Sequence, residues 1–152
     1  MNICKYTIIT LIAVLVAGCS SETKKVIVVK APLIIADALP IISATKRSVG
    51  VRINFENITA SDYNYARFKV TAYNSDGENI SPKKGNKESA YLRIAGPITA
   101  GSTKSSIWTN TWNSKGVNCI SLDEVELIFM DGSIEIAKGN RLLNKQKGNK
   151  CM

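Results

Sequence analysis

Cys19 is the residue of this chain whose surroundings point most directly to chemistry. One lysine, Lys5, precedes an uncharged and mostly apolar run at residues 7–16, and Ala17, Gly18 and Cys19 follow that run directly. A charged start, a short apolar stretch and small residues before a cleavage point are the parts of a secretory signal peptide. The sequence therefore predicts export, with a thiol at the point of cleavage.

Residues Val16, Ala17, Gly18 and Cys19 match the lipobox, and the segment resembles the signal of a bacterial lipoprotein. The resemblance implies removal of residues 1–18, a thioether-linked diacylglycerol on Cys19 and an acyl chain on its new amino group. No cofactor is expected beyond these covalent lipids. Ser20, which stands where aspartate would retain the protein in the inner membrane, implies the outer membrane, most simply its periplasmic face.

This segment has two other interpretations. A transmembrane helix requires about twenty apolar residues, and residues 6–17 are too few to span a bilayer comfortably. A signal peptide without lipid, cut after Gly18, does not account for a cysteine placed directly after Val-Ala-Gly.

The remaining cysteines form a pair once Cys19 is assigned to the lipid. Cys4 leaves with the signal, so the mature chain keeps Cys119 and Cys151, in a compartment that is oxidising in most Gram-negative bacteria. We expect a Cys119–Cys151 disulfide that ties the lysine-rich tail to the domain and contributes roughly 3–4 kcal/mol through loop closure. Two free thiols are the alternative.

Patterns for catalysis and metal binding are absent from the sequence. The chain has no histidine, which removes the commonest general base, the histidine-activated nucleophiles and most zinc ligand sets. It also has no Cys-x-x-Cys motif and no phosphate-binding glycine pattern. We therefore expect neither an enzyme nor a metal site.

Three weaker patterns have simpler explanations. Carboxylates able to meet in space for glycoside chemistry occur at Asp62, Asp76, Glu78, Asp123 and Glu124. Each of them is placed in a turn or beside a strand, where acidic residues are ordinary. The segment 76–79 invites a calcium interpretation but lacks the calcium-loop pattern, and a turn accounts for it. The segment 57–59 matches the glycosylation acceptor pattern, which in a bacterial protein is coincidence.

Trp108 and Trp112 are the remaining candidate binding residues. A spacing of four puts both indoles on one face of a strand, where they could stack on sugar rings or anchor a partner. The opposite face of that strand is less apolar, which favours burial of the tryptophans in a sandwich core.

The net charge of +8 suggests an anionic neighbour. No block of lysines reaches five or six, so the chain lacks a nucleic-acid-binding arm, and no nucleic-acid partner is expected. Basic residues near a tether can attract anionic headgroups; the simpler interpretation is that they keep an exported domain soluble.

Short β-branched and alternating segments dominate the rest of the chain. Strands are expected at residues 26–29, 33–35, 49–55, 68–73, 91–95, 107–112, 125–129 and 134–136. Pro32 separates the first two of these segments and Pro40 closes the second, residues 62–64 form a loop, and Asp131-Gly132 is a hairpin signal. The pattern predicts an all-β fold, an antiparallel immunoglobulin-like β-sandwich of about seven to eight strands, with a small β-barrel as the alternative.

Four regions follow from this pattern. Residues 1–18 are the signal, 19–25 the lipidated spacer, 26–139 the sandwich and 140–152 a basic tail tied back by the disulfide.

Several short sequence segments, taken in order, carry a second resemblance. They lie at residues 65–74, 96–98, 108–113, 119–122 and 129–133. Together they resemble a group of small exported bacterial domains with an immunoglobulin-like sandwich and no assigned biochemical role. The similarity covers roughly residues 49–136 and implies a fold, without implying functional residues.

These observations predict a membrane-anchored envelope lipoprotein with a non-catalytic binding or structural role. Its partners would be the membrane through the lipid, and another envelope protein or peptidoglycan through a sheet edge or a loop cluster. The alternative is a small exclusion or inhibitor lipoprotein of phage or plasmid type that blocks an envelope receptor or enzyme.

Overall fold

The structure, a computed structural model, describes residues 31–44, 47–84, 88–144 and 151. The signal motif, Cys19 and the strand expected at 26–29 lie outside these residues. The described part contains no helix long and apolar enough to cross a membrane.

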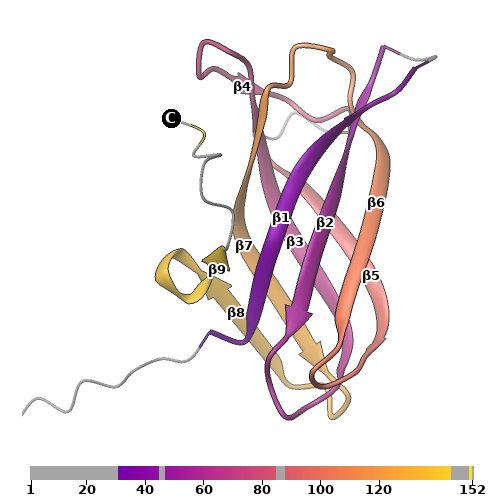
Figure 1. The fold of residues 1–152 in the computed structure, drawn as a ribbon, viewed down its shortest axis with the longest axis vertical. Helices are drawn as coiled ribbons and strands as arrows, with labels where there is room; N and C mark the ends of the chain where they lie inside the picture. The colour runs from indigo at the N-terminus through magenta and orange to yellow at the C-terminus, as the bar shows by residue number, and fades with distance from the viewer. Residues whose placement is uncertain (1–30, 45–46, 85–87, 145–150, 152) are drawn as a thin grey trace, which may run out of the picture.

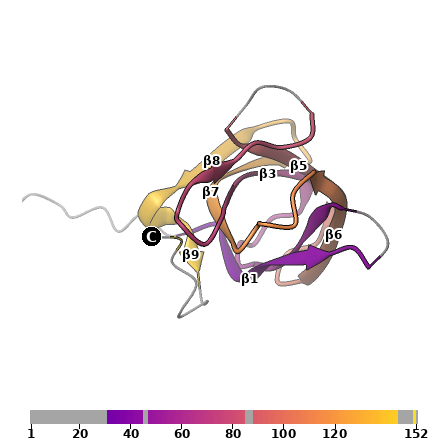
Figure 2. The ribbon, with the colours of Figure 1, turned by 90° about the horizontal axis from the view of Figure 1, so that it is seen from above.

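The described residues form an all-β fold of two facing sheets (Figures 1 and 2). Seven strands have five residues or more: β1 (Leu33–Ile42), β2 (Val49–Asn57), β3 (Tyr63–Tyr73), β5 (Ala90–Ile98), β6 (Thr103–Trp112), β7 (Cys119–Phe129) and β8 (Ile134–Lys138). Two strands have two residues each, β4 (Asn79–Ile80) and β9 (Leu143–Asn144). The predicted all-β class is therefore confirmed.

One sheet has the strand order β6-β2-β1-β9, and the other has β4-β3-β7-β8 with β5 also on β3. All pairings are antiparallel except that of β9 with β1. If the two-residue β4 is set aside, the second strand pairs with the fifth and the third with the sixth. An immunoglobulin-like sandwich has this arrangement, and the immunoglobulin-like type stays a prediction that the strand order favours.

The core fills the space between the sheets. Phe55 of β2 and Phe68 of β3 meet edge to face across it, with ring centroids 5.1 Å apart. Alternate residues of β2 are buried, because a strand that faces a core on one side presents every second side chain to it: Val49, Val51, Ile53 and Phe55. The alternation that predicted this strand is therefore confirmed.

A β-bulge at Asp123 changes which residues of β7 face the core. Lys69 pairs with Glu124 and Val70 with Leu122, so Asp123 is an extra residue in the ladder. One extra residue reverses the alternation, and the side chains that join the core are Ile120 before the bulge but Val125 and Leu127 after it.

The predicted hairpin at Asp131-Gly132 is also confirmed. The amide of Phe129 donates to the carbonyl of Ser133 over 2.9 Å, and Gly132 has a φ of +84°, which glycine adopts without steric cost. Hydrogen bonds from Ser133 hold the pKa of the Asp131 carboxyl below its usual value.

Three expected boundaries are wrong. β1 does not end at Pro40 but continues to Ile42, and among the described residues β9 pairs with β1 only at Ile34 and Ile35. Proline is tolerated on such an edge because its missing N–H is not needed there. β3 begins at Tyr63, inside the expected loop, and β9 lies in the expected tail, so the sandwich extends past residue 139.

Tyr63 closes the end of the core where β1 begins. Its hydroxyl donates to the carbonyl of Pro32 over 2.9 Å, and its ring packs against Phe129 at a centroid distance of 5.0 Å. Burial raises the pKa of the Tyr63 phenol above its ordinary value, because a phenolate would lose its hydration there.

Candidate binding groove

The two sheets meet at a margin formed by β5 and β6, which lie side by side in Figures 1 and 2. Two hydrogen bonds cross this margin. The indole Nε1 of Trp108 donates to the carbonyl of Arg93 over 3.1 Å, and the amide of Lys83 donates to the carbonyl of Thr111 over 2.8 Å. The second bond holds the loop before β5 against the end of β6.

A groove of about 550 Å³ opens along this margin. One wall is the loop residues 82–84, and the other sides come from Ser89 and the start of β5 (residues 90–92) and from residues 108–111 of β6. A volume of this size is typical of small-molecule sites. The groove is therefore the candidate binding site of the described chain.

Trp108 and Trp112 have different environments despite their common face. Trp112 is fully buried, so it belongs to the core and is wrong as a binding candidate. Its Nε1 has no hydrogen-bond partner among the described residues. Trp108 is partly buried, packs edge to face against Phe68 at 5.9 Å and lines the groove.

The backbone between the two tryptophans bulges at Asn110. On β2 the partners of Trp112 and Trp108 are Val49 and Val51, two positions apart, whereas the tryptophans are four apart. Asn110 has a φ of +56°, and its Oδ1 accepts a hydrogen bond from the hydroxyl of Ser48 over 2.5 Å. Asparagine tolerates the left-handed region better than most residues, so this position suits its residue type.

Gly50 allows β2 to lie close under this bulge. A Cβ atom at position 50 would overlap the carbonyl oxygen of Trp108. The groove-lining segment of β6 is therefore seated on a position of β2 that only glycine fits.

The polar lining of the groove is basic. Lys83 and Lys84 are both exposed at its wall, and no carboxylate lines it among the residues that the structure describes. Tyr91 is 48% exposed at the opposite side, and the Arg67 guanidinium lies 5.4 Å from its ring centroid. Glu88 lines only a smaller adjoining hollow.

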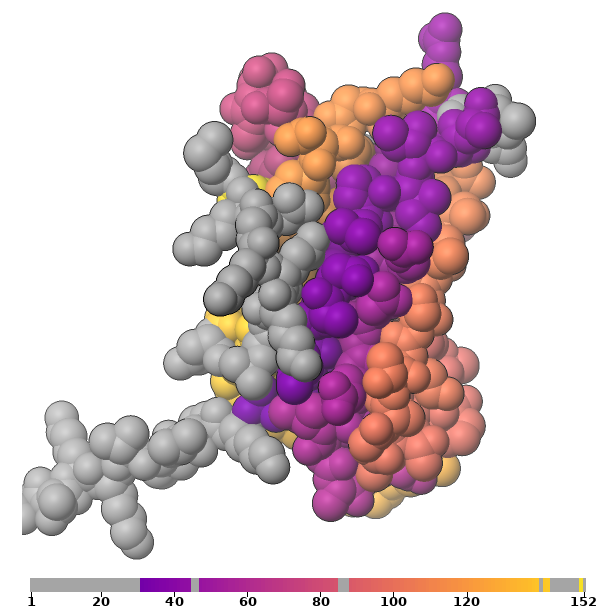
Figure 3. Space-filling model, viewed as in Figure 1, coloured from indigo at the N-terminus to yellow at the C-terminus, as the bar shows by residue number. Residues whose placement is uncertain are grey.

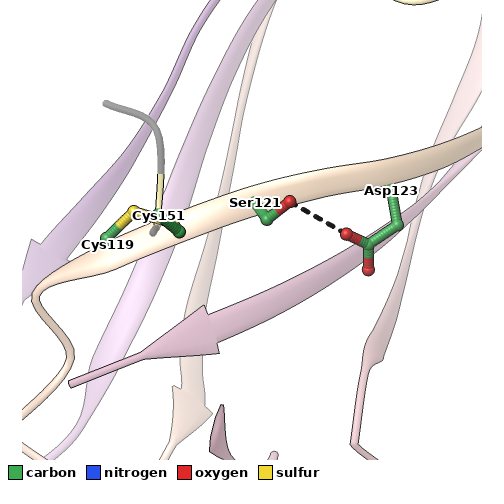
Figure 4. Close-up of a disulfide and its surroundings, with 4 residues drawn as sticks. All are labelled: Cys119, Ser121, Asp123 and Cys151. Carbon is green, nitrogen blue, oxygen red and sulfur yellow. Dashed lines mark hydrogen bonds between the residues drawn. A yellow bond between two sulfur atoms is a disulfide. The ribbon is translucent and has the colours of Figure 1, made fainter. Parts of the chain in front are cut away.

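The disulfide lies at a different place, at the start of β7 (Figure 4). Cys119 and Cys151 are bonded, with Cα atoms 5.7 Å apart, as the cysteine count predicted. On the same strand the hydroxyl of Ser121 donates to Oδ1 of Asp123 over 2.9 Å, and Thr71 donates to Oδ2 over 2.5 Å. Both oxygens of the bulge carboxylate are thus engaged in hydrogen bonds that fix the bulge.

The other sequence candidates are structural. Asn74 Oδ1 accepts from the amides of Asp76 and Glu78 over 2.9 and 2.8 Å, which organises the acidic turn. Asp62 accepts from the amide of Ala100 at the opposite end of the sandwich. Within the described ranges, no three acidic or cysteine side chains come together as a metal site.

Asn57, in the sequence that matches a glycosylation acceptor, is fully buried. Its Nδ2 donates to the carbonyls of Ser61, Ile98 and Thr99, and its Oδ1 accepts from the amide and hydroxyl of Thr59. This amide therefore fastens two loops together, which agrees with the interpretation of the motif as coincidence.

No protein-family model and no curated protein sequence matches this chain. Among solved structures, the fold is similar to that of a hypothetical protein from Peptoclostridium difficile 630, determined by X-ray diffraction at 1.85 Å. The TM-score is 0.51 at 12% identity, over 72% of this chain and 87% of the other. This likeness concerns the fold alone.

The sequence singled out one residue of the groove, Trp108. It offered no signal for the others, because Lys83, Lys84 and Tyr91 approach Trp108 only through the packing of one sheet against the other. The pair of lysines after Pro82 was visible, but only as part of a dispersed basic surface.

Proposed function

We propose that this protein is a lipid-anchored envelope domain that binds a partner non-covalently through the groove between β5 and β6. The observation that carries the proposal is the composition of that groove, which combines Trp108 and Tyr91 with Lys83 and Lys84. Aromatic and cationic side chains that share one concave surface are typical of binding sites.

The position of the groove supports a role directed away from a membrane. β1 begins beside the end of β2 and the start of β6, since Leu33 pairs with Asn57 and Glu56 with Thr103. The groove lies at the other end of β6, and β1 is long enough to separate the two ends by roughly 30 Å. In Figure 1 this places the start of β1 at the lower end and the start of β5 at the upper end.

The anchor would hold the domain by the end opposite to the groove. Cys19, which would carry the lipid, precedes Ala31 by a segment that can reach at most roughly 40 Å. The attachment point and the groove therefore lie at opposite ends of the domain, which leaves the groove open to a ligand on the side away from the bilayer. In an outer-membrane lipoprotein on the periplasmic face, that side is occupied by the cell wall and by periplasmic proteins.

Two variants test the anchor and the groove separately. Cys19→Ser should move the protein from the membrane fraction to the soluble or unprocessed fraction and abolish incorporation of a palmitate analogue. Lys83→Glu combined with Lys84→Glu should leave membrane fractionation unchanged but reduce envelope crosslinks by tenfold or more.

The matched control is Lys115→Glu combined with Lys138→Glu. It makes the same change in net charge at exposed positions outside the groove, so its crosslinks should equal those of the wild type. Equal crosslinking by all three proteins would overturn the groove as the binding surface. Incorporation of the palmitate analogue by Cys19→Ser at the wild-type level would overturn the anchor.

A further inference from the structure

We infer that the groove takes an acidic saccharide, with a sugar ring against Trp108 and its carboxylate near Lys83 and Lys84. The inference rests on the proposed function, because it names the ligand class of the same groove. It follows from three features of the lining: its aromatic groups, its charge and its hydrogen-bonding groups.

The indole of Trp108 is held in a fixed orientation before any ligand arrives. It is fixed by its hydrogen bond to Arg93 and by its edge-to-face contact with Phe68. Tyr91, which pairs with Lys69 and lies near the Arg67 guanidinium, is on the outer face of the other sheet, at the rim of the groove. A pre-organised aromatic surface binds the apolar face of a ring with little loss of side-chain entropy.

The charge of the lining favours an anion. Two ammonium groups on one wall, without a carboxylate among the described lining residues, create a positive potential in a concave site. Each lysine offers three donors on a flexible stem, which suits a carboxylate whose position varies from one sugar unit to the next.

Short polar groups complete the match to a sugar. Ser89, Thr109, Asn110 and Thr111 supply hydroxyl and amide groups around the groove. Hydroxyls that both donate and accept pair well with sugar hydroxyls. The volume of about 550 Å³ is in the range that small ligands occupy.

An extended acidic peptide fits the same groove less well. Peptides bind sheet edges through a continuous row of backbone groups, and here the carbonyl of Arg93 already accepts the Trp108 indole. The bulge at Asn110 also interrupts β6. Neither edge therefore offers an unbroken ladder beside the groove.

Binding to the purified full chain in detergent tests the inference, by calorimetry and by tryptophan fluorescence. The probes are trigalacturonate, N-acetylmuramic acid, neutral chitotriose and a hexapeptide rich in glutamate. We expect at least one acidic saccharide to bind, at least tenfold tighter than chitotriose or the peptide, and more weakly as salt increases.

The first two probes distinguish the sources of the ligand. Preference for the muramyl probe indicates cell-wall glycan, and preference for the uronate indicates a uronic-acid polysaccharide. Lys83→Glu with Lys84→Glu should weaken binding at least tenfold, whereas Lys115→Glu with Lys138→Glu should leave it unchanged. Trp108→Phe should remove most of the fluorescence response, because Trp112 is buried in the core.

Tighter binding of the peptide, equal binding of chitotriose, or no binding of either acidic saccharide overturns the inference. The proposed function has its own criterion, which is the loss of envelope crosslinks in the groove variant. If crosslinks depend on Lys83 and Lys84 while no saccharide binds, the ligand class is wrong and the binding groove stands.

Discussion

The indole N–H of Trp108 donates to the main-chain carbonyl of Arg93 over 3.1 Å, and so joins the margins of two different sheets. β6 belongs to one sheet and β5 to the other. This contact makes Trp108 both a structural link and part of the groove.

Trp108→Phe removes that link while retaining an aromatic ring against Phe68. We expect a loss of about 1 kcal/mol in the free energy of unfolding, the usual net contribution of one hydrogen bond, measured by urea denaturation. Trp112→Ala should cost about 3–5 kcal/mol, because it empties a fully buried site. Equal losses for the two variants would contradict the different placements of the two tryptophans.

Asn57→Asp preserves the shape of the buried side chain that fastens two loops together, but it replaces the donating amide group with an accepting oxygen. A carboxylate oxygen would replace the Nδ2 group that donates to three carbonyls, and an uncompensated buried charge costs about 3–5 kcal/mol. Thermal and urea unfolding measure this loss. Asn118→Asp, at an exposed position, is the control and should change stability by less than about 0.5 kcal/mol.

Tyr63→Phe should reveal the raised pKa of the phenol. At pH 8 the variant should be less stable by about 1 kcal/mol, because the hydrogen bond to Pro32 is lost. Above about pH 10 the unfolded tyrosine ionises while the buried one keeps its proton. Stability of the wild type therefore falls with rising pH relative to the variant.

The measurement for Tyr63 is the difference in unfolding free energy between the two proteins from pH 8 to 11.5. Lysine titration is common to both and cancels in that difference. A difference that stays constant across this range would contradict a raised pKa.

Reduction of the Cys119–Cys151 bond should lower the free energy of unfolding by roughly 3–4 kcal/mol, since the bond closes a loop with a sequence separation of 32. Urea unfolding with and without a reductant measures the change. The double variant Cys119→Ser, Cys151→Ser should match the reduced protein and ignore the reductant. If oxidised and reduced wild type unfold alike, the bond has no stabilising role.

The local features of the fold were predictable from sequence, and its exceptions were not. Alternation identified β2, and Asp131-Gly132 identified a hairpin, because both patterns act over a few residues. The bulge at Asp123 reverses the alternation within β7, so a single period could not describe that strand. Pro40 remained inside β1 because the described residues of β9 pair with β1 only at Ile34 and Ile35, which only the assembled sheet determines.

The candidate site was less predictable than the fold. Trp108 and Trp112 have the same residue type and the same strand face, yet one lines a groove and the other is core. The difference depends on the bulge at Asn110 and on the loop carrying Lys83, which is bound to Thr111 from far along the chain. The spacing of residues in the sequence does not indicate that this loop lies against the end of β6.

β9 pairs in parallel with Ile34 and Ile35, which lie near the start of β1, the strand that the chain enters after residue 31. A force that pulls on the chain before Ala31, with the opposite end of the domain held, would act along β1. The hydrogen bonds between β1 and β2 would then be loaded together in shear, rather than opened pair by pair (Figure 3 shows β1 running the length of that face). Beyond β9, Cys151 is covalently bonded to Cys119 of β7. In mechanical terms, the C-terminal strand reinforces the sandwich where a tether would load it.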